Sequence, residues 1–370
     1  MNIYYVYLSL LSSFLLSSCF PLKSIFLGNP DSKDLYRFKH SKINAGEECF
    51  EFYKLNRSIG SEVKINDWSS DIPFFKSLDN FSPSHNIRSI LIIQNDTVKY
   101  TYHNQHILLS DLHPSYSIAK SFTSTLIGIA IDEGNIKSEE ELVIKYIPEL
   151  QNIHHSKDLK IKDLLNHTSG IKYNLWNDAI IYYGDNIFKA IKKIKFENTP
   201  GTKQHYLNIN TQLLGLILKR ATGVSPAKYL EDKIWKPIQM CNDGQWSIDK
   251  KNQIEKTFCC IGATAEDYAK FGRLILNNGR WNNKVIISEQ WLNKSLSRDT
   301  SNGSSFNYNY SWHIGLKEYN DFMAIGLYKQ HIYVNRNKKL IIVLFNDREN
   351  KLIAERLNWW DIFRQIADQL

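Results

Sequence analysis

The stretch S-Y-S-I-A-K-S-F (residues 115–122) stands directly before a long apolar run, T-S-T-L-I-G-I-A-I-D-E-G (residues 123–134). It places three serines beside one lysine, Lys120, so it is either the polar start of a helix or a serine nucleophile with its base. The spacing S-x-x-K alone does not decide between these readings. It also occurs at four other places in the chain: Ser61/Lys64, Ser169/Lys172, Ser225/Lys228 and Ser247/Lys250.

Helix geometry and burial favour Ser117 as the reactive serine. The run after Lys120 is apolar on nearly every side through Ile131, which predicts a buried helix. Residues three apart share a helix face, so the amine of Lys120 can reach the hydroxyl of Ser117, whereas Ser115 is too distant and Ser121 points elsewhere. Burial lowers the pKa of a lysine, and a neutral amine is a general base. The backbone N–H of Ser117, at the helix start, would supply one donor to an oxyanion.

The other four S-x-x-K matches have contexts that indicate structural roles. Ser225 precedes Pro226, which is typical of an N-cap with proline at the first helical position. Ser61 and Ser247 stand in polar, loop-like sequence, and Ser169 follows a helix-like run inside H-T-S-G. Ser117 is therefore the candidate nucleophile and Lys120 the candidate base.

Length and composition predict a globular chain with two structural lobes, since 370 residues with 43% hydrophobic content can bury a large core. The 46 basic residues exceed the 38 acidic ones, giving a net charge of +8. Apart from K-K-I-K (residues 192–195), this excess is spread along the chain. Without a basic stripe interleaved with aromatic residues, we expect no nucleic-acid partner.

The N-terminal segment has the length of a signal peptide and is too short to span a bilayer comfortably. Residues 16–19, L-S-S-C, resemble a bacterial lipobox, which predicts a lipoprotein-type signal peptide over residues 1–19 and lipidation of Cys19. The protein would then be exported to the cell envelope and attached to a bacterial membrane, on its periplasmic or outer side. The segment before the apolar run lacks the usual Lys or Arg. A plain secretory signal or an N-terminal anchor therefore remains an alternative.

The remaining cysteines are Cys49, Cys241, Cys259 and Cys260, without C-x-x-C or a metal-ligand spacing to histidine. We therefore expect no metal site. Cys259 and Cys260 stand together in the run T-F-C-C-I-G-A-T-A, which indicates core positions rather than redox chemistry. A disulfide elsewhere is compatible with an exported chain.

Strand-like patterns lie near both ends of the chain, with mostly helical patterns between them. The runs at residues 87–94 and 97–103 flank a short polar turn and predict a β-hairpin, and residues 322–334 and 339–346 predict a second one. We expect an α+β fold: an antiparallel sheet flanked by helices, plus an inserted helical lobe, with the site in a cleft between them. The expected boundaries are a polar tether over residues 20–60 and a folded main domain over 61–370. Its sheet lobe would comprise residues 61–135 and 296–370, and its helical lobe residues 136–295.

Four segments, in the order expected, resemble the serine β-lactamase-like superfamily. They are S-I-A-K-S-F-T-S-T-L-I-G-I-A-I-D-E-G (117–134), L-L-N-H-T-S-G (164–170), Y-L-N-I-N-T-Q-L-L-G-L-I-L (206–218) and F-C-C-I-G-A-T-A-E-D-Y-A-K-F-G-R-L-I-L-N-N-G-R-W (258–281). They look most like the class C-related branch that contains 6-aminohexanoate-dimer hydrolases, family VIII esterases and D-aminopeptidases. The similarity covers roughly residues 85–350 and implies a β-lactamase/penicillin-binding-protein-like fold.

The resemblance implies catalytic roles for four residues and no cofactor. Ser117 would be the acylated nucleophile and Lys120 its base. Tyr206 and Asn208 match the family pattern Y-x-N, in which the tyrosine passes a proton to the leaving group and helps to activate the deacylating water, while the asparagine orients substrate and lysine. A phenolate stabilised by the lysine ammonium could also act as a base near neutral pH.

The third family motif, K-T-G or H-x-G, is where the chain departs from the pattern. Its best match is Ala324-Ile325-Gly326-Leu327, in which Gly326 stands for the motif's glycine and the N–H of Leu327 would be the second oxyanion donor. Charge-assisted pairing to a carboxylate contributes about 1.5–3 kcal/mol, so the uncharged Ala324 argues against efficient penicillin recognition. Lys329 either restores a cation near the site or faces solvent.

Four further residues have a structural alternative to a role in the site. His167 is structural in the family, where it helps to hold a loop. Trp176 could line the substrate cleft or pack the helical lobe. Tyr333 and Asn335 also fit Y-x-N, but they lie in a strand-like run, which favours a structural role.

The sequence therefore predicts a serine hydrolase of the Ser-Lys-Tyr type that forms a covalent acyl-enzyme on a small ester, amide or short peptide, in the manner of a 6-aminohexanoate-dimer hydrolase or an esterase. One alternative is a β-lactamase, D-alanyl peptidase or penicillin-binding activity. Another is a catalytically silent surface lipoprotein that binds cell-wall fragments. The retained Ser117, Lys120, Tyr206 and Asn208 favour an enzyme over the silent protein.

Overall fold

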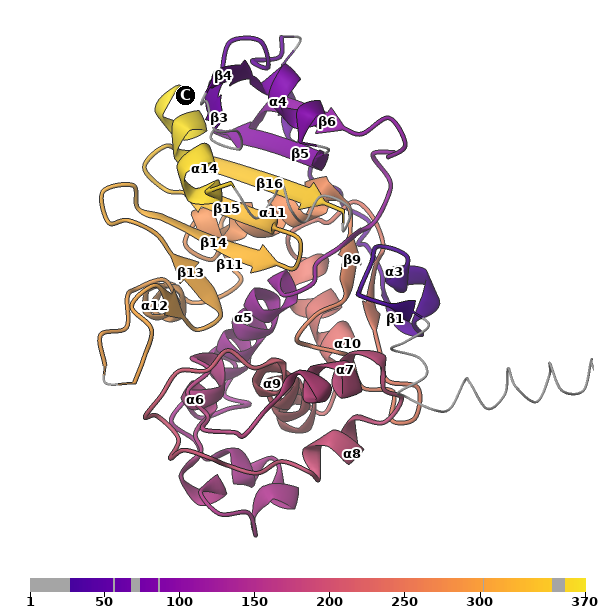
Figure 1. The fold of residues 1–370 in the computed structure, drawn as a ribbon, viewed down its shortest axis with the longest axis vertical. Coiled ribbons are helices and arrows are strands. Elements are labelled where there is room, and N and C mark those ends of the chain that lie inside the picture. The colour runs from indigo at the N-terminus through magenta and orange to yellow at the C-terminus, as the bar shows by residue number, and fades with distance from the viewer. Residues whose placement is uncertain (1–26, 56, 68–73, 86, 302, 348–356) are drawn as a thin grey trace, which may run out of the picture.

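The computed structural model describes residues 27–370 except 56, 68–73, 86, 302 and 348–356 (Figure 1). The predicted signal peptide and Cys19 lie outside the described residues. Within the described part of the chain, no helix is both long enough and apolar enough to cross a bilayer.

An eight-stranded sheet forms the upper part of the molecule in Figure 1. Its strand order is β12-β13-β14-β15-β16-β5-β6-β2, and a four-stranded sheet of order β1-β8-β9-β7 lies beside it. The strands are β1 (His40–Ile43), β2 (Tyr53–Lys54), β3 (Lys64–Asp67), β4 (Phe74–Ser77), β5 (Ile87–Gln94), β6 (Thr97–His103), β7 (His113–Pro114), β8 (Gly244–Ser247), β9 (Ile261–Ala263), β10 (Arg280–Trp281), β11 (Lys284–Val285), β12 (Tyr308–Asn309), β13 (Trp312–Ile314), β14 (Asp321–Gly326), β15 (Gln330–Asn335) and β16 (Leu340–Asn346).

Helices cover both faces of the large sheet and build the lower lobe (Figure 1). They are α3 (Asp34–Arg37), α4 (Leu78–Ser84), α5 (Ile118–Asp132), α6 (Ile161–Leu165), α7 (Leu175–Tyr183), α8 (Ile187–Ile191), α9 (Asn208–Thr222), α10 (Pro226–Leu230), α11 (Ala265–Leu276), α12 (Glu289–Ser295) and α14 (Trp359–Asp368), with 3-10 turns at Val143–Lys145, Pro148–Leu150 and Ser156–Asp158 and a π-helical turn at Glu231–Trp235.

The predicted closure of the sheet by both ends of the chain is confirmed. β5 pairs antiparallel with β16, so an early strand completes the sheet made by late ones. β5 and β6 form the predicted hairpin, and its turn residues Asn95 and Asp96 have φ angles of 51° and 57°. Asn and Asp tolerate this left-handed conformation better than most residues, which explains why this dipeptide makes the turn. The fold class, α+β with an antiparallel sheet, is therefore as expected, apart from β2, which pairs parallel to β6.

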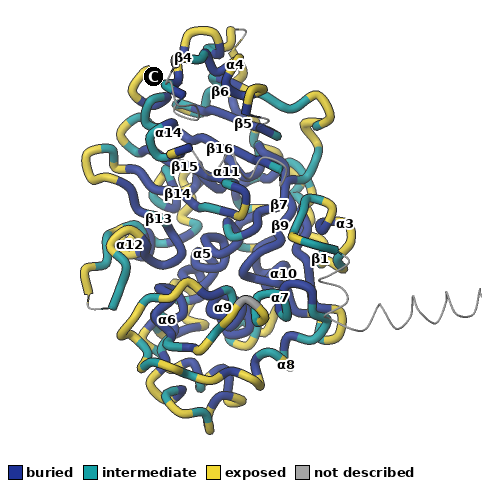
Figure 2. The backbone as a smooth tube through the Cα atoms, viewed as in Figure 1, coloured by how far each residue is buried: buried dark blue, intermediate teal, exposed yellow. Residues whose placement is uncertain are grey.

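The helix α5 crosses the middle of the molecule and is buried from its first residue to Ala130 (Figure 2). Together with α11 it packs against one face of the large sheet, while α14 packs on the other through residues such as Phe363. The contact of α11 is close: a side chain at Gly272 would meet Ile341 at 2.9 Å and Ile332 at 3.1 Å. The predicted boundary at residue 295 is therefore wrong for α11, which belongs to the sheet lobe.

The predicted tether over residues 20–60 is also wrong for its described part. Residues from α3 to β2 are integrated in the fold: β1 pairs with β8, and the side chains of Leu35, Ile43 and Phe52 are buried. A disulfide between Cys49 and Cys241 joins this segment to a part of the chain 192 residues away. The strands here have only four and two residues, so they leave little periodic signal in the sequence.

One predicted strand is in fact a hairpin. Residues 322–334 were expected to form one strand, but β14 ends at Gly326 and β15 begins at Gln330. The turn between them contains Tyr328 and Lys329, both with φ of 62°. Residues other than glycine rarely adopt this conformation, so the sequence carried no turn signal here. The turn matters for function, because it lies at the cleft described next.

Candidate active site

The first turn of α5 brings the two principal predicted residues together. The Nζ atom of Lys120 lies 2.8 Å from Oγ of Ser117 and donates a hydrogen bond of 2.9 Å to the carbonyl of Phe258. The Lys120 side chain is 1% exposed and has no carboxylate within salt-bridge distance among the described residues. Burial lowers the pKa of this amine from 10.5 to about 7, against a smaller upward effect of the Asp178 charge. A substantial fraction of Lys120 is therefore neutral at neutral pH and able to accept the Ser117 proton.

The segment before Ser117 is fixed by strand-like hydrogen bonds and contains one residue with a strained backbone. Ser115 donates its N–H to the carbonyl of Ile261 at 2.8 Å, and its hydroxyl accepts the Ile261 N–H at 2.9 Å. Tyr116 has a φ of 43°, an uncommon conformation for a tyrosine that turns the chain from β7 into α5. The hydroxyl of Ser121 donates to the carbonyl of Ser311. Ser115 and Ser121 thus have structural partners, which leaves Ser117 as the candidate nucleophile of this stretch.

Tyr206 lies against the same pair of residues. Its ring centroid is 4.9 Å from Nζ of Lys120, and its phenol is hydrogen-bonded to Ser117. Although 43% of Tyr206 is exposed to the cleft, desolvation raises the pKa of its phenol above the usual value, and the hydrogen bond with Ser117 only partly offsets this effect. The phenol is therefore protonated at neutral pH. The expectation of a phenolate base is not supported, and the neutral amine of Lys120 fits that role better.

His167 supports Tyr206 from behind. The two rings stack at 4.5 Å between centroids, and Nδ1 of His167 accepts the backbone N–H of Leu207 at 3.0 Å. The His167 ring is completely buried, and this burial, with the Lys120 charge nearby, holds its pKa well below the usual value. A neutral imidazole in this position fixes the start of α9 and the Tyr206 ring, in agreement with the structural role expected for it.

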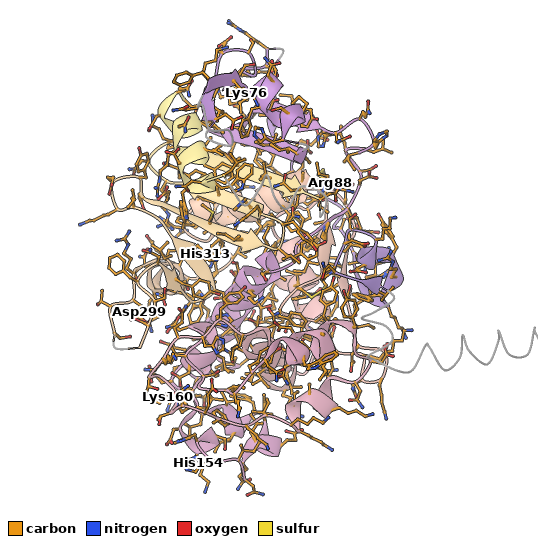
Figure 3. All side chains as sticks on the ribbon, viewed as in Figure 1. Lys76, Arg88, His154, Lys160, Asp299 and His313 are labelled. Carbon is orange, nitrogen blue, oxygen red and sulfur yellow. A yellow bond between two sulfur atoms is a disulfide. The ribbon has the colours of Figure 1, made fainter. Side chains whose placement is uncertain are left out.

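Two other histidines, His313 and His154, lie in different parts of the molecule (Figure 3). His313 is on β13, where burial, assisted by the charge of Lys120, lowers its pKa to about 4. His154 lies at the far end of the helical lobe (Figure 3). His313 is thus uncharged at neutral pH, so it adds no positive charge beside Lys120.

A carboxylate that the sequence analysis missed, Asp178 on α7, joins the site. Its Oδ1 accepts hydrogen bonds from Nδ2 of Asn208 at 2.8 Å and from the phenol of Tyr173 at 2.7 Å. The side-chain amide of Asn208, which was expected to orient substrate and Lys120, thus donates its hydrogen bond to Asp178. Trp176, at the start of the same helix, is 60% exposed, whereas Asp178 lines the cleft. Asp178 carries no sequence signal of its own, since only the packing of α7 against α9 brings it to Asn208.

The end of β14 forms the opposite side of the site. A side chain at Gly326 would lie 2.5 Å from the carbonyl oxygen of Ser115, so glycine is needed for this approach. Leu327, the next residue, lines the cleft together with Ser117. Lys329 is two residues further on. Burial, with a smaller effect of the Lys329 charge, lowers the pKa of His331, whose ring packs against α14. This placement favours the interpretation in which Lys329 acts away from the substrate.

Five of the site residues described so far line a cleft of about 740 Å³: Ser117, Asp178, Tyr206, Asn208 and Leu327. Its walls are rich in aromatic rings, and the segment Gly28–Pro30 closes one side. That segment is held by the phenol of Tyr328, which donates to the carbonyl of Pro30 at 2.7 Å, and by the phenol of Tyr183, which donates to Gly28. The other lining residues are Tyr116, Ala179, Tyr182, Phe258 and Cys259.

The sequence pattern of the Beta-lactamase family matches residues 91–363. The 6-aminohexanoate-dimer hydrolase of Paenarthrobacter ureafaciens is 22% identical over 282 residues, which cover 69% of this chain and 71% of that protein. Protein flp of Staphylococcus aureus (strain MW2) is 31% identical over 134 residues, which cover 34% of this chain and only 27% of that protein.

Solved structures share the fold. A Bacillus anthracis protein assigned as a 6-aminohexanoate-dimer hydrolase superposes with a TM-score of 0.79 at 22% identity, covering 89% of this chain and 90% of that one. The hydrolase EstCE1, described as having promiscuous acyltransferase activity, superposes with a TM-score of 0.59 at 11% identity, covering 75% of this chain and 95% of that one.

Proposed function

The chain belongs to the beta-lactamase family, and we propose that it is a serine hydrolase that cleaves an ester or amide bond through a covalent acyl-enzyme. The observation that carries this proposal is the pair Ser117 and Lys120: a hydroxyl 2.8 Å from a fully buried amine whose pKa is about 7. A buried lysine without a carboxylate partner is costly for the fold. Its position beside a serine hydroxyl in a cleft supports a catalytic use.

In the first step, Ser117 Oγ attacks the substrate carbonyl while the neutral amine of Lys120 takes the hydroxyl proton. The carbonyl oxygen becomes an oxyanion, which the N–H groups of Ser117 and Leu327 would stabilise. The tetrahedral intermediate collapses by breaking the bond to the leaving alcohol or amine, which receives a proton from the phenol of Tyr206. The Lys120 ammonium restores that proton, so the amine is neutral again.

In the second step, water replaces the leaving group. The neutral amine of Lys120, through Tyr206, accepts a proton from the water as its oxygen attacks the acyl carbon. Collapse of this second intermediate breaks the bond to Ser117 Oγ, returns the proton to it and releases the acid. Desolvation keeps Tyr206 protonated between steps, which suits a group that passes protons on without staying ionised.

The charges of the cleft support substrates with a cationic rather than an anionic end. The carboxylate of Asp178 lines the cleft near Ser117, whereas Ala324, which replaces the family's cationic residue, is uncharged and fully buried. A substrate ammonium group could pair with Asp178. A substrate carboxylate, such as that of a penicillin, would face Asp178 without a matching cation from position 324. We therefore favour an amine-bearing ester or amide over the β-lactamase alternative.

The Asp178→Asn variant tests this preference. Charge-assisted pairing contributes about 1.5–3 kcal/mol, so kcat/KM for an ester with a terminal ammonium should fall about 10- to 100-fold. The same variant should change kcat/KM less than about threefold for a neutral ester of equal length. The side-chain oxygen of an asparagine can still accept the hydrogen bonds from Asn208 and Tyr173, so the structure around position 178 should be kept. Asp158→Asn, at an exposed position in a 3-10 turn, is the matched control. Equal losses on both esters would contradict the charge argument.

Active-site labelling tests the proposed reaction itself. A fluorophosphonate probe should label the purified protein, abolish its hydrolysis of p-nitrophenyl esters, and be recovered by mass spectrometry on the peptide that contains Ser117. No labelling at any pH from 6 to 9 would contradict the hydrolase and favour the protein that only binds. A chromogenic cephalosporin is the second substrate, and its turnover at the rate of the esters would overturn the argument from Ala324.

A further inference from the structure

Cys259 and Cys260 form a disulfide between neighbouring residues at the edge of the cleft. Their expected place in the core is confirmed, with 4% and 5% exposure. The bond between them was not expected from the sequence. Cys259 also lines the cleft together with Ser117. The catalytic steps described above make no use of this bond.

The disulfide stands between two contacts that hold the catalytic residues. Directly before it, the carbonyl of Phe258 accepts the hydrogen bond from Lys120. Directly after it, Ile261 exchanges two hydrogen bonds with Ser115, two residues before the nucleophile. The backbone distance between these two contacts is set by Cys259 and Cys260. The dipeptide therefore determines how the base and the nucleophile segment lie relative to each other.

The backbone of this dipeptide is in a conformation that needs support. Cys260 has a φ of 73°, in the left-handed region that residues with a side chain seldom adopt. The bond between adjacent side chains closes an eight-membered ring, which restricts the backbone torsions of both residues. Trp246 donates to the carbonyl of Cys259 at 2.9 Å, and the N–H of Ser247 donates to the carbonyl of Cys260 at 3.1 Å. The N–H of Cys259 also donates to the carbonyl of Lys256 at 2.9 Å. Opening the ring would leave the strained residue to be held by such hydrogen bonds without the covalent restraint.

We propose that the Cys259–Cys260 disulfide is a positioning device for Lys120 and Ser117, so that the enzyme is fully active with the bond closed and is slowed when a dithiol opens it. This inference rests on the proposed hydrolase function. In the opening step, one thiolate of the dithiol attacks Sγ of Cys259 from the cleft side, which breaks the bond to Cys260 and releases the Cys260 thiolate. The second thiolate then attacks the dithiol sulfur of this mixed disulfide and releases the Cys259 thiolate. The pair gains two electrons and two protons to become two thiols, and the dithiol becomes a disulfide.

The second disulfide provides a matched comparison. Cys49 and Cys241 are 192 residues apart, so their bond restricts the unfolded chain and joins β1 and β2 to the body, without a hydrogen bond to Ser117 or Lys120 among the described residues. Removal of this bond should reduce thermal stability and leave the chemistry alone. Loss of the Cys259–Cys260 bond should slow the reaction and change thermal stability less. The two double variants thus separate positioning from general stabilisation.

The first experiment compares Cys259→Ser/Cys260→Ser with Cys49→Ser/Cys241→Ser. We expect the first variant to lose about tenfold or more in kcat/KM and in the rate of fluorophosphonate labelling, since small displacements of catalytic groups are costly. The acidic limb of its pH profile of kcat/KM should also move to higher pH. A displaced Lys120 is better solvated, so its amine has a higher pKa and is harder to deprotonate. The second variant should have the same kcat/KM and the same pH profile as the wild type but a lower Tm. Unchanged rate and limb in the first variant would overturn the proposal.

The second experiment keeps the protein's own cysteines at the site. In the Cys49→Ser/Cys241→Ser background, a dithiol should reduce the remaining pair, as shown by alkylation of both thiols, and kcat/KM should fall by about tenfold and recover on reoxidation. Full activity with both thiols alkylated or reduced would contradict the inference. If the wild type takes up no fluorophosphonate at all, the hydrolase proposal itself has failed. A wild type that is labelled but is indifferent to reduction overturns the positioning role alone.

Discussion

Ser117→Ala is expected to lower kcat/KM for esters by about 10⁴-fold or more while the protein stays folded. In the proposed mechanism Oγ of Ser117 is the protein atom that forms a covalent bond to the substrate. In serine hydrolases of other folds, removal of the nucleophile lowers the rate by about 10⁴- to 10⁶-fold. The change removes one oxygen that faces the cleft, so the packing of α5 is kept. The measurement is single-turnover hydrolysis of a p-nitrophenyl ester together with fluorophosphonate labelling, both of which should vanish.

Ser121→Ala is the matched control for this prediction. It removes the same hydroxyl four residues along the same helix, where the group donates to the carbonyl of Ser311 rather than facing the cleft. Loss of this buried hydrogen bond should cost about 1 kcal/mol of folding free energy and leave kcat/KM within about threefold of the wild type. Comparable loss of activity in both variants would mean that the effect comes from the helix and not from the nucleophile.

The sequence could predict Ser117 and Lys120 because their relation is local. Because Ser117 and Lys120 are three residues apart on a helix, their side chains lie on the same face. The apolar run that follows indicates that the lysine is buried. The same holds for the β5–β6 hairpin, whose alternating strands and Asn95-Asp96 turn lie within one short segment. Ser225 likewise caps α10 through the N–H of Lys228, as its Pro226 neighbour indicated.

The features that escaped prediction depend on distant contacts or on strained backbone. Asp178 becomes part of the site only because α7 packs against α9, and nothing in its own neighbourhood marks it. The turn at Tyr328 and Lys329 uses left-handed torsions without glycine, so a hairpin was read as one strand. The short β1 and β2 are stabilised by pairing with β8 and β6 and by the bond from Cys49 to Cys241, none of which a local pattern reveals.

Lys120→Met is expected to reduce kcat/KM by about 10³- to 10⁴-fold and at the same time to make the protein more stable. Methionine has a similar length and fits a buried apolar site, but it cannot take the Ser117 proton. The double variant Ser117→Ala/Lys120→Met should be no less active than Ser117→Ala alone, because the two residues act as one unit. Additive losses in the double variant would show that Lys120 acts independently of Ser117.

The stability gain follows from the lowered pKa of Lys120. In the unfolded chain this lysine titrates near 10.5, and in the folded protein near 7, so between these values the unfolded state binds more protons. Folding is therefore penalised in full below about pH 7, and the penalty disappears as the pH rises towards 10.5. A shift of this size corresponds to roughly 4–5 kcal/mol of folding free energy at pH 7. In Lys120→Met the carbonyl of Phe258 loses its hydrogen-bond donor, which offsets about 1–3 kcal/mol of this gain.

Urea denaturation of wild type and Lys120→Met at pH 7 and at pH 10 measures this directly. The variant should be more stable at pH 7 by about 1–4 kcal/mol, and this advantage should shrink or reverse at pH 10, where the wild-type lysine is neutral in the fold. The comparison variant is Lys270→Met, which removes a buried lysine that pairs with Asp267 at 2.9 Å. It should be destabilised, because it leaves a buried carboxylate without its partner. A stabilised Lys270→Met or a destabilised Lys120→Met at pH 7 would contradict the view that Lys120 is kept at a cost to the fold for its reaction with Ser117.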